Sequence, residues 1–260
     1  MKTGKVAIDL KNITHSFPDS LNLFRDFSLQ VGMSERIAIV GASGAGKSTL
    51  LEIIAGLELV QKGERILSSH EGSRPRIGYI SQKDALLPWY TITRNIQLQM
   101  MLSNLKEHTT VSYENDWINK LGLLETQDKL PDQLSGGERQ RASIAMTLSA
   151  NPDILLLDEP SASLDFQSKL LLEEHLVRLV YGDAPRTTIL VTHDIDQALI
   201  LADRVLVLGR HQKDPAKIVF ELSVELNVSE RQPILARKSQ FVRDAFEEIW
   251  GKLRPFVRTT

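Results

Sequence analysis

The 260-residue chain contains no cysteine. Disulfides, thiolate metal sites and cysteine nucleophiles are therefore excluded. Neither sign of charge dominates, because 31 lysines and arginines stand against 33 aspartates and glutamates, a formal net charge of −2. A nucleic-acid-binding surface normally produces a basic excess. We therefore expect no nucleic-acid partner.

The sequence also lacks a long apolar run. Segments such as 154–157 and 188–191 are far too short to cross a bilayer. Residues 1–5 lead directly into a strand-like segment, so we expect no secretion signal. Hydrophobic residues still make up 42% of the chain, enough for one large core with an added subdomain. Any role at a membrane must then come through a partner.

Apolar periodicity predicts an α/β fold. Residues 6–13 alternate as a half-buried strand does, and 27–31 follow after a short connection, so we expect this pair to be antiparallel. Further along, apolar strands alternate with helical patterns, which is typical of a parallel sheet wrapped by helices. The segments with strand character are 6–13, 27–31, 36–40, 65–67, 76–80, 154–157, 188–191, 205–208 and, as an edge strand, 218–222.

The domain prediction follows from composition. Residues 1–83 and 151–225 form the core with its N-terminal antiparallel β subdomain. Residues 84–150 are polar and helix-prone, with breaks at prolines and a glycine, and we interpret them as a helical insertion. Residues 226–260 form a C-terminal helical extension. Its apolar side chains recur at every fourth position, at Phe241, Ala245, Ile249 and Leu253.

The most informative motif fits the phosphate-binding pattern G-x-x-x-x-G-K-[ST]. It consists of Gly41, Ala42, Ser43, Gly44, Ala45, Gly46, Lys47, Ser48 and Thr49. A buried-strand pattern precedes it and an amphipathic helical pattern, 47–55, follows, which is the context that this motif requires. Glycines let backbone N–H groups turn inward around an anion, and a helix N-terminus adds partial positive charge. We expect Lys47 to reach the β- and γ-phosphates and the Ser48 hydroxyl to hold Mg²⁺.

Two carboxylates end the apolar segment 154–157. Asp158 and Glu159 precede Pro160, at the kind of strand end where open parallel sheets bind ligands. We expect Asp158 to complete the Mg²⁺ shell and Glu159 to orient or deprotonate the attacking water. The alternative is an acidic strand end that only begins a turn.

A second helix start is suited to an anion. Ser135 and Glu138 fit a capping box, and Gly136 and Gly137 between them leave room for a phosphate to approach the N–H groups. The alternative is a capped helix with no ligand.

These three segments together carry a resemblance. The phosphate loop, then Leu-Ser-Gly-Gly-Glu-Arg-Gln at 134–140, then Leu-Leu-Leu-Asp-Glu-Pro at 155–160, resemble the ATP-binding subunits of ABC transporters, and the likeness extends from residue 6 to about 222. The resemblance implies a P-loop NTPase core, and ATP hydrolysis with Mg²⁺. In this family two subunits face each other head to tail, and the signature helix of one closes over the nucleotide held by the other.

Four further residues resemble positions of the family's site. Gln82 is similar to the glutamine that touches Mg²⁺ and senses the transmembrane partner. The segment Ser-Ala-Ser-Leu-Asp at 161–165, which ends in Asp165, is similar to the loop that couples the two ATP sites. His193 resembles the switch histidine that contacts the γ-phosphate, and Phe17 the aromatic residue that stacks on adenine. Gln82 and His193 could instead be ordinary strand-end polar groups, and Phe17 a core residue.

The subtype rests on a shorter likeness. Leu-Leu-Pro-Trp at 86–89 resembles importers for nitrate, sulfonate, taurine and related small solutes, as do residues 91–96 and 241–253. Trp89 lies where the family docks its permease, so we expect it at that interface, the alternative being a core position in the helical insertion. The chain departs from the family pattern at 80–82, where Ile-Ser-Gln stands in place of the usual Phe-Gln, and at Ala42 and Ala45, which flank the loop glycines.

The resemblance implies an assembly of two such subunits, two permease subunits and an external solute-binding protein, with this chain peripheral on the cytoplasmic face of the membrane. Three alternatives stay open. The ATPase could serve another transport system (lipid, metal or export), it could act in solution on DNA or ribosomes, or the chain could be an ATP-gated interaction module whose turnover does not matter.

Overall fold

The computed structural model describes residues 5–17, 22–82, 85–103, 111–182, 186–211 and 214–257. Its strands are β1 (Val6–His15), β2 (Phe24–Gly32), β3 (Arg36–Gly41), β4 (Lys62–Leu67), β5 (Ile77–Ile80), β6 (Ile154–Asp158), β7 (Thr187–Thr192), β8 (Arg204–Gly209) and β9 (Lys217–Ser223). Its α-helices are α1 (Lys47–Ala55), α2 (Ile92–Leu102), α3 (Val111–Lys120), α4 (Gly136–Ser149), α5 (Phe166–Val180), α6 (Ile195–Leu201), α7 (Pro233–Ala236) and α8 (Gln240–Leu253). Short 3-10 helices are η1 (Pro131–Gln133), η2 (Val228–Arg231) and η3 (Arg254–Phe256).

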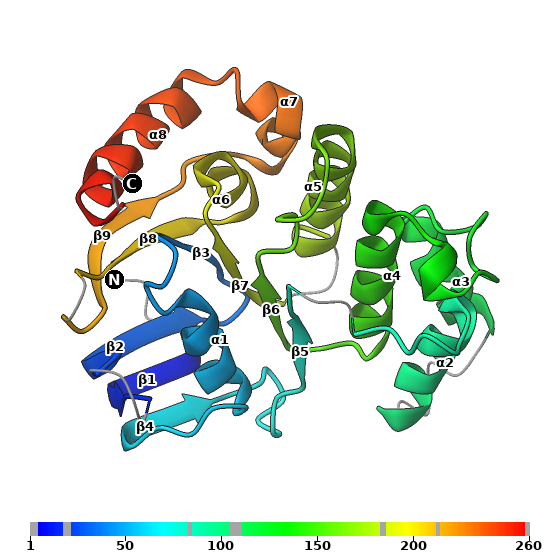
Figure 1. Cartoon of the computed structure of the whole chain (residues 1–260), viewed down its shortest axis with the longest axis horizontal. Coiled ribbons are helices and arrows are strands. Elements are labelled where there is room, and N and C mark those ends of the chain that lie inside the picture. The colour runs from blue at the N-terminus through cyan, green and yellow to red at the C-terminus, as the bar shows by residue number, and fades with distance from the viewer. Residues whose placement is uncertain are drawn as a thin grey trace.

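The strands form two sheets (Figure 1). A three-stranded sheet has the order β2-β1-β4, and β1 pairs antiparallel with both neighbours. A six-stranded sheet has the order β5-β6-β7-β3-β8-β9, in which β9 alone runs antiparallel to its neighbour. The predicted α/β fold, the antiparallel N-terminal pair and the edge strand β9 are all confirmed.

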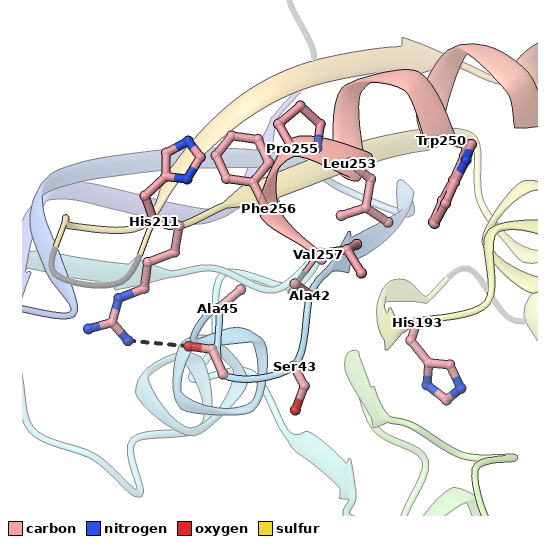
Figure 2. A pocket seen from close by; sticks show the side chains of 13 residues that line it. Ala42, Ser43, Ala45, His193, His211, Trp250, Leu253, Pro255, Phe256 and Val257 are labelled. Carbon is pink, nitrogen blue, oxygen red and sulfur yellow. Dashed lines mark hydrogen bonds between the residues drawn. The ribbon is translucent and has the colours of Figure 1, made fainter. Parts of the chain in front are cut away.

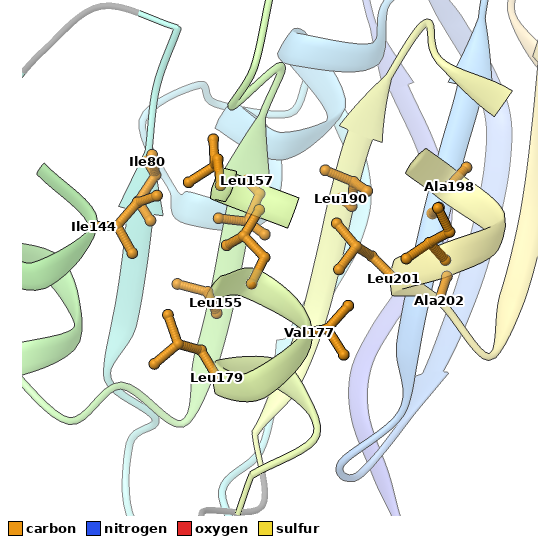
Figure 3. Close-up of a cluster of buried hydrophobic side chains, with 14 of the residues drawn as sticks. Ile80, Ile144, Leu155, Leu157, Val177, Leu179, Leu190, Ala198, Leu201 and Ala202 are labelled. Atoms are coloured by element: carbon orange, nitrogen blue, oxygen red, sulfur yellow. The ribbon is translucent and has the colours of Figure 1, made fainter. Parts of the chain in front are cut away.

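The central strands are buried on both faces, which explains their continuous apolar sequences. Along β3, Ala38 and Val40 join one apolar cluster, whereas Ile37 and Ile39 join the other. The first cluster lies under α5, α6 and α8, and Figure 3 shows part of it, with Leu155, Leu157 and Leu190 from the sheet. The second fills the space between the sheet, α1 and the three-stranded sheet. Each fully buried leucine or isoleucine contributes about 1.5–3 kcal/mol, so these two clusters are a main source of the fold's stability.

Helices α2, α3 and α4 pack on one another at one end of the molecule, beside β5 (Figure 1). All three fall inside the range predicted as a helical insertion, and the division into domains stays a prediction. At the other end, α8 packs on α6, β8 and β9 through Val242, Ala245, Ile249 and Leu253. Among the described helices, none combines the length and apolar character needed to span a bilayer.

Candidate functional site

Sheet topology brings the predicted residues to one edge. Strands β5, β6, β7 and β3 are neighbours in that order and run parallel. Gln82 follows β5, Asp158 ends β6, His193 follows β7 and the glycine-rich loop follows β3. Because carboxyl ends of parallel strands share one edge, these four positions lie along the same edge of the sheet.

The phosphate loop connects β3 to α1. Gly44 and Gly46 have φ angles of 78° and 100°, in the left-handed region that favours glycine. A Cβ atom at Gly46 would lie 3.0 Å from Leu23 Cδ1 and 3.2 Å from Phe24 Cζ. Helix α1 begins there without a side-chain cap and without an acidic residue in its first turn. The N–H groups of this helix start are thus left for another acceptor.

The Lys47 side chain is buried at the base of the loop. Its Nζ donates to the carbonyl oxygens of Gly41 at 2.9 Å and Ala42 at 3.2 Å, and it lies 3.9 Å from Glu159 Oε1. Burial lowers the pKa of Lys47, and the carboxylates of Glu159 and Asp158 oppose that shift. A positive charge held here would gain from an anionic ligand.

Asp158 accepts two hydroxyl hydrogen bonds. Ser48 Oγ donates to Oδ1 at 3.0 Å, and the Tyr79 hydroxyl donates to Oδ2 at 3.3 Å. Burial raises the pKa of Tyr79, followed by the negative charge of Asp158, so the phenol keeps its proton and remains a donor. Sequence reasoning missed Tyr79, because its contact with Asp158 depends on the pairing of β5 with β6, which no local sequence pattern specifies.

The donor set fits Mg²⁺. Hard oxygen ligands suit this ion, which usually takes one or two carboxylates and completes its shell with substrate phosphates and water. Ser48 and Asp158 supply such oxygens. In the described ranges, no group of three or more His, Cys, Asp or Glu side chains could hold a metal by itself. A ligand with phosphate oxygens would be required to complete the shell.

Glu159 lies between Lys47 and His193. The His193 ring Nδ1 is 2.7 Å from Glu159 Oε2, and the His193 backbone N–H donates to the same oxygen at 3.4 Å. The Glu159 backbone has φ of 49°, a left-handed conformation that is uncommon outside glycine and typical of functional positions. Its own N–H donates to the Val191 carbonyl at 2.9 Å, which fixes the turn.

Asp165 is the N-cap of α5. Its carboxylate accepts from the backbone N–H groups of Gln167 and Ser168, both at 3.0 Å, and from Ser168 Oγ at 2.7 Å. These hydrogen bonds, the Ser168 hydroxyl first, lower the pKa of Asp165. One turn further, Lys169 pairs with Asp194, the residue after His193. The loop after Glu159 and the loop holding His193 are therefore tied together.

The predicted capping box at α4 is present. Ser135 Oγ accepts from the Glu138 N–H at 3.3 Å, and Glu138 Oε2 accepts from the Ser135 N–H at 2.7 Å. These bonds lower the pKa of Glu138. A Cβ at Gly137 would lie 3.1 Å from Ser168 Oγ, so this helix start borders the start of α5. Helices α1 and α4 stand apart in the molecule (Figure 1), so the two predicted anion sites occupy different parts of one chain.

Gln82, Phe17 and Trp89 are all exposed. Phe17 is 40% exposed and meets His15 edge-on, with ring centroids 5.0 Å apart, so the core alternative for it is wrong. Trp89 is 67% exposed, which also rules out a core position in the helical region.

A family model described as "ABC transporter" matches residues 24–162, more than half of the chain. The chain belongs to the ABC transporter family. ABC ATP-binding proteins of this family hydrolyse ATP, so the chain is an ATP-binding ATPase of a transport system.

Curated relatives extend over most of this ABC ATPase. It is 37% identical over 263 residues to the aliphatic sulfonates import ATP-binding protein SsuB 2 of Burkholderia lata, covering 99% of this chain and 93% of that one. It is 39% identical over 214 residues to SsuB 1 of Rhodococcus jostii, covering 79% and 80%. An uncharacterized ABC transporter ATP-binding protein of Bacillus subtilis, YtlC, is 34% identical over 251 residues, covering 95% of both.

A solved structure gives the fold comparison. The cassette MJ0796, in a dimeric post-hydrolysis state bound to ADP and Pi, matches with a TM-score of 0.69 and 27% identity, over 85% of this chain and all of that chain. The P-loop ATPase core predicted from the sequence is thereby confirmed.

Proposed function

We propose that the chain is the ATP-hydrolysing subunit of an importer for a small anion. Alkanesulfonates, including taurine, are the leading class of solute, and nitrate is another small anion of the same kind of importer. The SsuB relatives carry import of aliphatic sulfonates in their names, at 37–39% identity. The exposed Trp89, in the Leu-Leu-Pro-Trp segment that resembles these importers, supports the same assignment.

The observation that carries the proposed mechanism is the contact of Glu159 with both Lys47 and His193. In our proposal the loop 41–49 and Lys47 hold the triphosphate. Glu159 then accepts the proton of the attacking water, or orients that water, and the His193 imidazole holds the Glu159 carboxylate and meets the γ-phosphate. The left-handed turn at Glu159 lies directly after β6, and its carboxylate makes both contacts.

Mg²⁺, when bound, would neutralise charge on the phosphates, and we propose Ser48, Asp158 and Gln82 as the residues that hold it. The Ser48 to Asp158 hydrogen bond already places both oxygens together. Tyr79 keeps the other carboxylate oxygen in position. Phe17, exposed beyond the end of β1, is proposed to stack on the adenine.

We propose a second copy of the chain as the partner. Ser135, Gly136, Gly137 and Glu138 start a helix far from the loop, so one chain cannot close both anion sites on one triphosphate. A head-to-tail pair resolves this, because each nucleotide then meets one loop and one signature. The dimeric MJ0796 cassette supports this arrangement, and Asp165, which anchors the loop after Glu159, would couple the two sites.

Two permease subunits and an external solute-binding protein complete the proposed system. Trp89 would be an anchor for the permease, since large exposed aromatic rings commonly carry interface energy. The chain would then act at the cytoplasmic face of the membrane as a peripheral subunit.

A complementation experiment tests the proposal. A strain of the source organism without this gene would be grown with an alkanesulfonate, or taurine, as the only sulfur source, and complemented with the wild-type gene or with Glu159→Gln. We expect growth with the wild type alone, because the variant binds ATP but does not turn it over. All strains should grow equally on sulfate.

Two readouts separate the parts of the proposal. If the deletion strain grows on sulfonates while the purified protein hydrolyses ATP, the solute class is wrong and the ATPase site stands. If purified Glu159→Gln retains more than about a hundredth of the wild-type rate, the role of Glu159 as base is wrong.

A further inference from the structure

The C-terminal segment lies over the phosphate loop. We call residues 250–257, the end of α8 together with η3, the C-terminal cover. A cavity of about 850 Å³ separates the two, with residues 41–45 and His193 on one wall and the cover on the other (Figure 2). The cover comes from the far end of the sequence, so its position beside the loop is a product of the fold.

Arg210 connects this region to the tip of the loop. Its Nη1 donates to the Gly44 carbonyl at 3.2 Å, and its Nε donates to the Asp214 carbonyl at 3.1 Å (Figure 2 shows the first of these bonds). A Cβ at Gly44 would meet nothing within 4 Å, so packing does not hold the loop tip in place. The Arg210 hydrogen bond therefore restrains the loop at the residue on its open side.

Phe256 of the cover holds the chain on either side of Arg210. Its ring lies so close to Gly209 that a Cβ there would be 2.6 Å from Phe256 Cζ. On the other side, the Phe256 and His211 rings have centroids 4.4 Å apart. Gly209 ends β8, and β8 pairs with β3 next to Gly41. Phe256 therefore packs at the end of the strand that places Arg210 beside the phosphate loop.

The loop base is restrained differently. Lys47 donates to the carbonyls of Gly41 and Ala42 from inside the loop, so a triphosphate would compete with these carbonyls for its ammonium group. Arg210 reaches the Gly44 carbonyl, and a carbonyl does not compete with phosphate for the loop N–H groups. This contact can persist when the loop is filled.

We propose that Arg210 is a positioning residue for ATP, that Phe256 holds Arg210 in place, and that the C-terminal cover thereby sets the affinity of the phosphate loop. This rests on the proposed function only in that the loop holds the triphosphate. Any event that lifts the cover, such as contact with another subunit, would weaken ATP binding without touching a catalytic group.

The test measures Mg-ATP affinity by calorimetry, and KM and kcat of the ATPase, on the full-length protein. For Arg210→Ala we expect affinity to fall and KM to rise by about fivefold to tenfold, the effect of one typical solvent-exposed hydrogen bond, with kcat within about twofold. Arg210→Lys should restore part of the affinity. The effect should persist in high salt, which screens a simple charge effect.

Phe256→Ala should also weaken Mg-ATP binding, by less than Arg210→Ala does. Arg210→Ala combined with Phe256→Ala should be no weaker than Arg210→Ala alone, since residues that act through one another are not additive. Phe246→Ala is the matched control, because this ring is exposed on α8 and does not line the cavity; it should bind ATP as the wild type does.

Unchanged affinity in Arg210→Ala overturns the proposal. Full additivity with Phe256→Ala overturns the part assigned to the cover. Lys47→Ala separates this inference from the proposed site: if that variant binds ATP normally, the site itself is wrong, whereas if it loses binding and Arg210→Ala does not, only the present inference fails.

Discussion

Two helices of this protein begin with glycine-rich segments, and they treat their exposed N–H groups in opposite ways. Helix α1 has Gly46 as its N-cap residue, with no side-chain cap and no acid in its first turn. Helix α4 has Ser135 as its N-cap residue, with a complete capping box and Glu138 in its first turn. The first start is open and carries a buried lysine, whereas the second is closed on itself and carries a carboxylate.

The difference implies an order of events. An anion gains from the dipole and free N–H groups of α1 at once, without displacing a side-chain cap. At α4 the Ser135 hydroxyl is already an acceptor for Glu138, and the Glu138 carboxylate repels negative charge. The phosphate loop should therefore bind the nucleotide first. The start of α4, residues 135–138, should contact that nucleotide only after a second copy of the chain has docked.

The largest expected effect on ATP binding comes from a change at the uncapped start of α1. Lys47→Ala should weaken ATP binding by about a hundredfold or more, since a lysine that contacts two phosphates through charged hydrogen bonds contributes about 3 kcal/mol. Isothermal calorimetry with Mg-ATP measures this directly. Lys62→Ala, which removes an exposed lysine on β4, is the control and should bind normally. Wild-type affinity in Lys47→Ala would contradict the loop assignment.

An intermediate effect, on the ATPase rate, is expected from a change at the capped start of α4. Ser135→Ala should leave ATP binding to the single chain within about twofold, because the loop is untouched. The ATPase rate should fall by about tenfold or more, because the partner's γ-phosphate loses one hydroxyl donor. Steady-state ATPase assays and calorimetry give the two values.

Ser239→Ala is the matched control for that variant, since Ser239 is an N-cap whose side chain makes no capping bond. It should change neither value. Loss of ATP binding in Ser135→Ala would mean that the signature belongs to the primary site, and the proposed order of events would be wrong.

The sequence allowed some features of the site to be predicted and not others. Both helix starts were predictable, because each is specified by neighbouring residues: the loop by its glycines, the capping box by Ser135 and Glu138. Contacts from distant segments were not. The Tyr79 hydroxyl on Asp158, the Arg210 guanidinium on Gly44 and the Phe256 ring against Gly209 depend on strand order and on the path of the C-terminal helix. No local pattern encodes them.

The smallest effect concerns the cap itself. Glu138→Ala removes one half of the capping box and should lower the free energy of unfolding by about 1 kcal/mol at neutral pH. The hydrogen bonds from Ser135 hold the pKa of Glu138 below that of a free glutamate, so the unfolded chain binds the proton more readily. The contribution is therefore complete above the ordinary glutamate pKa of about 4.3 and is lost as the pH falls through the folded value.

Urea unfolding of the wild type and Glu138→Ala at several pH values checks this, with Glu248→Ala, an exposed glutamate of α8, as the control. The difference between wild type and Glu138→Ala should narrow as the solution becomes acidic, and the control should show none. A difference that stays constant in acid would mean that the carboxylate charge does not support the α4 start. The contrast between the two helix ends would then rest on Ser135 and Lys47 alone.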